Sequence, residues 1–159
     1  MKKLFLLMMC LLLPLGAMAK DDDLNYEIES AGVGASGMTL VKVSVYVKKV
    51  KNASSELLKK AAVHGIIFRG VSASNVTGYS KQRALVTSPA AEEQYADFFD
   101  SFFADGGRCM AYATMVNATT ETVKVGKEYR VSAVVNVSTD ALKKDLKDAG
   151  VIKGMVDGF

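Results

Sequence analysis

Apolar and polar side chains alternate along residues 38–50, and this period of two predicts a strand with one buried face. The apolar positions are Val41, Val43, Val45 and Val47, and the polar positions are Lys42, Ser44, Tyr46 and Lys48. A looser alternation over residues 24–31 predicts a strand before it. The glycine-rich residues 32–37 predict a hairpin connection between the two strands.

Helical spacing follows in two stretches. Capping oxygens at residues 52–55 precede a helix over residues 56–68, which becomes apolar on nearly all sides and is therefore expected to be buried. Ser88 and Pro89 form a helix start before a second helix that is expected to end at residues 106–107. Its aromatic positions indicate core packing, with a ligand pocket as the alternative, and they are Tyr95, Phe98, Phe99, Phe102 and Phe103.

Renewed alternation predicts two long strands, over residues 108–117 and 122–137. A last amphipathic helix begins at residues 139–140, and residues 84–87 predict one further short strand. The predicted order is ββα(β)αββα. We therefore expect an α+β fold, with an antiparallel sheet of four to five strands and two to three helices packed on one face.

The amino-terminal residues predict export. A cationic start at Lys2 and Lys3 precedes an apolar run over residues 4–15 and the small-x-small sequence that ends at Ala19. This run is shorter than the roughly 20 residues that span a bilayer, so it favours a signal peptide (residues 1–19) cleaved after Ala19. We expect one domain over residues 20–159, located in the periplasm or at the cell surface, with no integral membrane segment after cleavage.

Charge and cysteine content exclude several classes of protein. The chain has 20 basic and 17 acidic side chains, and removal of Lys2 and Lys3 leaves 18 against 17, so nothing favours binding to nucleic acid. Cys10 lies in the predicted signal peptide without a convincing lipobox before it, which leaves Cys109 as the single cysteine of the exported chain and precludes an intramolecular disulfide. The lysine-started signal and the lack of disulfides indicate a bacterial protein.

Three patterns resemble chemical sites. Residues 32–37 match the dinucleotide fingerprint G-x-G-x-x-G, but a strand follows where that motif needs a helix, so we predict a hairpin and no cofactor. His64 and Cys109 leave a nucleophilic pair open, although their apolar surroundings favour packing. Asp97, Asp100 and Asp105 lack the spacing of a calcium loop, and we predict a solvated face and no metal.

Residues 72–88 are the stretch that packing explains least. Long irregular connections in compact domains are often functional or disordered. Tyr79, Lys81, Gln82 and Arg83 are candidates for a contact surface there, and a loop without a binding role is the alternative.

Two segments carry a resemblance. Residues 128–150, a strand followed by a helix with Leu142, Leu146 and Gly150, resemble the closing strand and helix of small α+β domains in bacterial envelope-assembly proteins of the curli-secretion CsgG type and the flagellar FlgT amino-terminal type. The helix over residues 57–68 is similar to the helix that those domains pack on their sheet. Unlike those families, this chain has no apolar hairpins that could build a pore. The whole chain resembles small exported proteins of unknown function from Bacteroidetes, and neither resemblance implies a catalytic residue.

These observations predict a non-enzymatic exported envelope protein that acts through protein–protein contacts, as an accessory to envelope or secretion assembly. The expected partner is another envelope protein or a second copy of the chain. A periplasmic domain that binds a small molecule or glycan is the alternative, and a hydrolase using Cys109 or a carboxylate pair also stays open.

Overall fold

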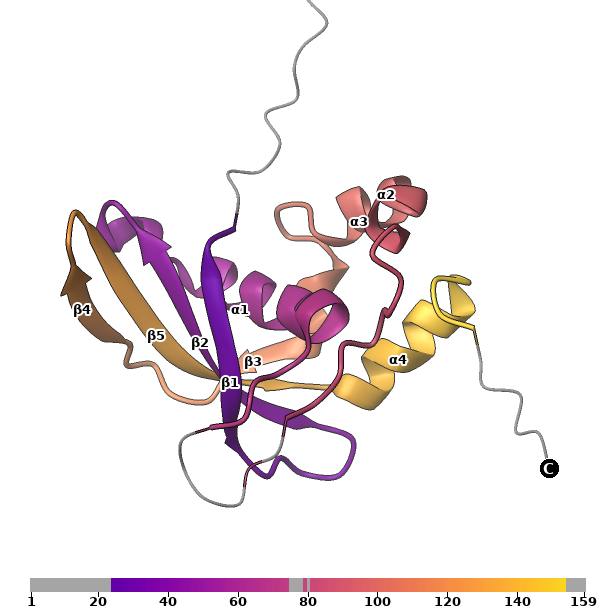
Figure 1. Cartoon of the computed structure of the whole chain (residues 1–159), viewed down its shortest axis with the longest axis horizontal. Helices are drawn as coiled ribbons and strands as arrows, with labels where there is room; N and C mark the ends of the chain where they lie inside the picture. The colour runs from indigo at the N-terminus through magenta and orange to yellow at the C-terminus, as the bar shows by residue number, and fades with distance from the viewer. Residues whose placement is uncertain (1–23, 75–78, 80, 154–159) are drawn as a thin grey trace, which may run out of the picture.

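The computed structural model describes residues 24–74, 79 and 81–153, so the predicted signal peptide lies outside the described residues. The fold is α+β, as predicted, with a five-stranded antiparallel sheet and helices packed against one face (Figure 1). The strands are β1 (Tyr26–Gly32), β2 (Thr39–Val47), β3 (Ala113–Met115), β4 (Glu121–Val125) and β5 (Glu128–Val137). The α-helices are α1 (Ser55–His64), α2 (Ala91–Gln94), α3 (Ala96–Phe102) and α4 (Thr139–Asp148). A π-helical turn, Gly65–Arg69, continues α1, and 3-10 turns occupy Val50–Asn52 and Arg108–Tyr112.

The sheet has the order β1-β2-β5-β3, with β4 also paired to β5. Because β2 lies on one side of β5, β3 and β4 follow one another along its other side. The predicted valine face of β2 is confirmed: Val41, Val43 and Val45 are fully buried under the helices. The hairpin prediction for residues 32–37 is also confirmed, since this turn joins the paired strands β1 and β2.

Helix α1 packs across the buried face of the sheet. Its start is capped as predicted, because the Leu57 N–H donates to Ser54 Oγ at 3.1 Å. Leu58, Ala61, Ala62 and Val63 are completely buried, which confirms the prediction of a helix covered on most sides. The π-helical turn ends at Gly70, whose φ of +76° favours glycine.

The predicted aromatic cluster forms part of the core. Phe99 and Phe102 are buried, and the Phe99 ring lies 4.8 Å from Phe68 and 6.1 Å from Phe103 between centroids. The single helix predicted after Pro89 is interrupted at Tyr95, which separates α2 from α3, and it ends at Phe102 instead of at residues 106–107. Tyr95 leaves helical geometry, with φ of −112° and ψ of 33°, and its hydroxyl donates to the Gly150 carbonyl.

Three predicted strands differ from the structure. Residues 108–112 form a 3-10 turn because Cys109 and Tyr112, three residues apart, both contact the core, which suits a three-residue period. The predicted strand over residues 122–137 is divided at Gly126, whose φ of +62° permits a two-residue hairpin turn between β4 and β5. Residues 84–87 form no strand, because the Leu85 and Val86 N–H groups donate to the carbonyls of the π-helical turn.

The described helices are all short. None of them is long and apolar enough to cross a bilayer.

Candidate functional site

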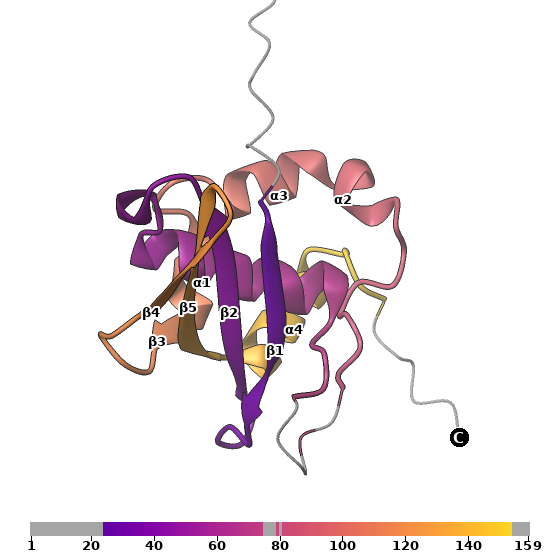
Figure 2. The same cartoon turned by 60° about the vertical axis from the view of Figure 1, so that its left-hand side comes forward.

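One face of the sheet has no helix over it in the described part of the chain (Figure 2). We call this the open face. The register of the strands gives it two halves of different character. The half on β1 and β2 is polar and carries Glu27, Glu29, Lys42, Ser44 and Tyr46. The half on β3, β4 and β5 mixes valines with polar side chains such as Glu121, Arg130 and Ser132, and its valines define the candidate site.

Four valines lie on this second half, and three of them are exposed. Val116, Val123 and Val125 are 48%, 39% and 46% exposed. The Val116 N–H donates to the Val134 carbonyl, which places half-buried Val134 beside Val116 on the same face. We call these four residues the valine patch. Glu121 and Ser132 lie between the pair of Val116 and Val134 and the pair of Val123 and Val125, so the valine patch alternates apolar and polar side chains, as contact surfaces often do.

Polar contacts fix the strands beneath and beside the valine patch. Ser44 Oγ and Ser132 Oγ lie 2.7 Å apart in a buried cross-strand pair, and Lys42 forms a 3.1 Å ion pair with Glu121 on β4. Tyr46 lies near Glu27 and Arg130, and its pKa is raised by desolvation and then by the Glu27 carboxylate. These contacts hold β2, β5 and β4 in register, so the patch is presented on a firm support.

The two edges of the sheet differ in how their backbone groups are satisfied. At the β1 edge, Arg69 donates to the Tyr26 carbonyl at 3.0 Å, and Ser72 bonds through its backbone to Ile28 and Ser30. At the β4 edge every residue from Glu121 to Val125 is exposed, and the described residues place no strand beyond it. A free strand edge is a template for pairing with another chain.

The predicted contact residues do not lie on the valine patch. Gln82 pairs through its backbone with Val71, and Thr39 Oγ1 donates to its side chain at 3.4 Å. Lys81 and Arg83 are exposed, while half-buried Tyr79 lies close to Gly32. Gln82 and Arg83 line a shallow groove of about 430 Å³ between the β1–β2 turn and the start of α4, so the structure brings them together without Lys81.

His64 joins a chain of polar groups that runs from buried Tyr26 to exposed Glu92 at the carboxyl end of α1. Its Nδ1 lies 2.6 Å from the Tyr26 hydroxyl, and its Nε2 lies 3.4 Å from Glu92 Oε1. Burial lowers the pKa of His64, Glu92 opposes this shift, and Arg69 and Lys60 add to it. A neutral ring therefore accepts from Tyr26 and donates to Glu92, while the Arg69 guanidinium lies 4.1 Å above the Tyr26 ring. This arrangement therefore joins α1 to buried β1 on one side and to α2 at the surface on the other.

Cys109 is separate from this chain of contacts. The ring nitrogens of His64 contact Tyr26 and Glu92 and not the thiol. Cys109 is fully buried, and burial raises the pKa of its thiol, which disfavours the reactive thiolate. Asp97, Asp100 and Asp105 are exposed, and the described residues contain no group of three His, Cys, Asp or Glu side chains placed to hold a metal.

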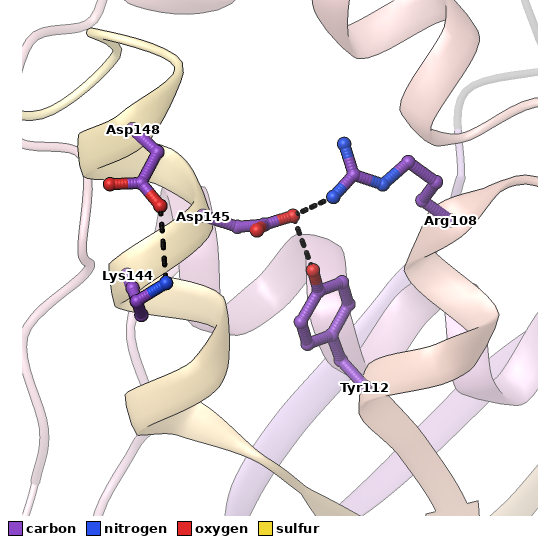
Figure 3. Close-up of polar contacts among 5 residues, drawn as sticks. All are labelled: Arg108, Tyr112, Lys144, Asp145 and Asp148. Atoms are coloured by element: carbon purple, nitrogen blue, oxygen red, sulfur yellow. Dashed lines mark hydrogen bonds and ion pairs between the residues drawn. The ribbon is translucent and has the colours of Figure 1, made fainter.

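A further polar cluster joins the 3-10 turn to α4 (Figure 3). The Arg108 guanidinium and the Tyr112 hydroxyl both donate to the carboxylate of Asp145. Lys144 and Asp148 form an ion pair at 3.4 Å on the exposed side of the helix. The arrangement anchors α4 beside the turn that contains Cys109.

Sequence reasoning missed the valine patch. Its only local signal is the short Val-Lys-Val stretch before Gly126, which continues into a longer alternating segment. Whether Val123 and Val125 face helices or solvent depends on which side of the sheet the helices cover. The pattern within one strand does not contain that information.

Comparison with known proteins adds no assignment to this geometry. No family model, curated protein or solved structure matches the chain.

Proposed function

We propose that this chain is a non-enzymatic, exported envelope protein that acts through protein–protein contacts made by the valine patch. Its place would be as an accessory to envelope or secretion assembly. The observation that carries the proposal is the exposure of Val116, Val123 and Val125, each more than a third exposed, on the same sheet face, which has no helix over it in the described part of the chain. Export rests on the signal-like residues 1–19, and the envelope setting on the resemblance of residues 128–150 to envelope-assembly domains.

The energetic basis is burial of apolar surface. Complete burial of an exposed valine contributes about 1.5 kcal/mol, so covering the exposed parts of three half-exposed valines would contribute about 2 kcal/mol. That free energy corresponds to a roughly 30-fold change in the dissociation constant. Such a contribution fits a specific contact that also uses hydrogen bonds and charge.

A photo-crosslinking amino acid introduced at Val123 in the producing cell tests this proposal. The matched control is the same substitution at Lys147, an exposed position of α4 on the helical side of the molecule. We expect discrete crosslinked products from position 123 and none from position 147. Products that are absent at position 123, or that are equal at both positions, would contradict the valine patch as a contact surface.

The export part of the proposal has a separate test. Amino-terminal sequencing of the protein recovered from the cell envelope should begin at Lys20. A product that begins at Met1, or recovery only from the cytoplasm, would contradict it.

A further inference from the structure

We propose that two copies of this chain pair edge to edge through β4, around a two-fold axis at Val123, and join their sheets into one. This inference rests on the proposed contact function of the valine patch and commits it to one occupant, a second copy. Its basis is the hydrogen-bonding pattern of β4 together with the charges beside it.

The direction of the β4 backbone groups follows from the register. Val116 donates to Val134, and Ser138 donates to Tyr112, so the even-numbered residues of β5 bond toward β3 and β4. Glu121, Val123 and Val125 pair with the even-numbered residues 132, 130 and 128. Backbone groups alternate in direction along an antiparallel strand, so those of Thr122 and Lys124 point away from the sheet.

These outward groups are placed symmetrically about Val123. In an antiparallel pair of β4 strands centred there, Thr122 of one copy faces Lys124 of the other, and each pair exchanges both hydrogen bonds. All residues from Glu121 to Val125 then have a partner, whereas a shift of the axis to Thr122 or Lys124 leaves part of the strand unpaired. The two Val123 side chains meet directly on the open face and extend the valine patch across the junction.

The charges fit this register. Glu121 of one copy faces Val125 of the other and lies diagonal to Lys127 in the turn that follows it. Lys124 faces Thr122 and not a second lysine. Opposite charges are thus brought near one another twice, which a parallel pairing of two β4 strands would not achieve, while the two Lys124 side chains lie diagonal to each other on the other face of the sheet.

The opposite edge limits the assembly to two chains. Arg69 donates to the Tyr26 carbonyl, the Ser72 N–H donates to the Ile28 carbonyl, and the Ser30 N–H donates to the Ser72 carbonyl. A third copy therefore finds no comparable free edge on β1. A contact that uses the same surface on both subunits closes as a dimer instead of growing into a fibre.

Disulfide formation between cysteine variants tests both the pairing and its register, with the exported protein purified intact. Val123→Cys places two thiols directly opposite in a non-hydrogen-bonded pair, where the Cβ separation of about 4.5 Å is at the upper end of the range for a disulfide. Val125→Cys is the matched control, since Val125 is on the same face and similarly exposed but faces Glu121 of the other copy. Cys109, the single cysteine of the described residues, is buried and does not compete in this reaction.

Under mild oxidation we expect at least tenfold more disulfide-linked dimer from Val123→Cys than from Val125→Cys. A mixture of Val125→Cys and Glu121→Cys chains should form the mixed dimer. Equal yields at positions 123 and 125 would overturn the register. Light scattering after gel filtration should give twice the mass of one chain, and a single-chain mass at every concentration would overturn the inference.

Thr122→Pro removes an outward N–H without removing a bond to β5, so we expect a folded single chain, whereas Thr122→Ser should remain a dimer. Circular dichroism checks that both variants are folded, and a folded Thr122→Pro dimer would contradict pairing through β4. If the protein is a monomer in solution while position 123 crosslinks to other proteins in the cell, the proposed dimer is wrong and the proposed function stands. If position 123 makes no contact in either experiment, both proposals fail.

Discussion

Substitution of Gly65 by alanine places a methyl group in a close contact between helix and sheet. A Cβ atom at this position would lie 2.8 Å from Ile28 Cδ1 and 3.1 Å from Ile28 Cγ2 and Tyr26 Cε2. The backbone there is helical, with φ of −61° and ψ of −44°, so alanine adopts it without strain. The outcome depends on two opposing effects, helix propensity and crowding.

Replacing glycine by alanine inside a helix stabilises a protein by about 1 kcal/mol, whereas an extra methyl group in a packed core costs about 1–3 kcal/mol. We therefore expect Gly65→Ala to lower the free energy of unfolding by about 1 kcal/mol. For a domain of this size that is a decrease of about 4 °C in Tm.

The double variant with Ile28→Val isolates the crowding. Ile28→Val removes Cδ1 and costs about 1 kcal/mol by itself. In that background the added methyl group at position 65 has lost its nearest neighbour, so the helix-propensity gain offsets the remaining crowding. We expect the double variant to be at least as stable as Ile28→Val, with a coupling of about 1 kcal/mol between the two positions.

Urea unfolding followed by far-ultraviolet circular dichroism measures all three variants and the original chain. Additive losses, with a coupling below about 0.3 kcal/mol, would refute the contact between Gly65 and Ile28. So would a Gly65→Ala variant that is more stable than the original chain, because the clash would then be absent.

Three further predictions concern the core and its buried titratable groups. Phe99→Ala should lower the free energy of unfolding by about 3 kcal/mol. Phe98→Ala, at a half-buried position, should cost about half as much in the same urea assay. Equal losses for the two variants would contradict the placement of Phe99 in the core. Burial lowers the folded-state pKa of His64 below its ordinary 6.5. Below pH 6.5 the unfolded chain therefore binds more protons than the folded chain does. The free energy of unfolding should accordingly be highest above pH 6.5 and should decrease as the pH falls below that value. His64→Gln should make the free energy of unfolding less dependent on pH in this range. A pH dependence identical to that of the original chain would contradict the prediction. A thiol reagent should not label Cys109 until urea unfolds the protein; labelling of the native chain would show that the residue is accessible.

The parts of the fold that the sequence predicts are those in which one local pattern persists. The valines of β2 repeat at a period of two over the whole strand, and Ser54 directly precedes an uninterrupted helical stretch. The errors occur where a single residue or a three-residue period changes the element. Gly126 divides a continuous alternation, and the core contacts of Cys109 and Tyr112 favour a 3-10 turn over a strand.

The candidate site was less accessible to sequence reasoning. Residues 79 and 81–83 stand out in the sequence because no packing pattern explains them, and Gln82 and Arg83 do line a groove. The valine patch consists of residues from β4, β5 and the end of β3, and it exists only because β3 and β4 share one side of β5. Strand order in the sheet is a long-range property, and no short segment encodes it.

The carbonyls of the π-helical turn hold residues 85–86 through main-chain hydrogen bonds. The Leu85 and Val86 N–H groups donate to Ile66 and Ile67 at 3.1 and 2.8 Å, so main-chain atoms attach this stretch to the buried helix. Every amino acid except proline supplies such a donor. At half-buried Leu85 this attachment is therefore compatible with many side chains, and a redesigned surface there can change its chemistry while the path of the chain is preserved.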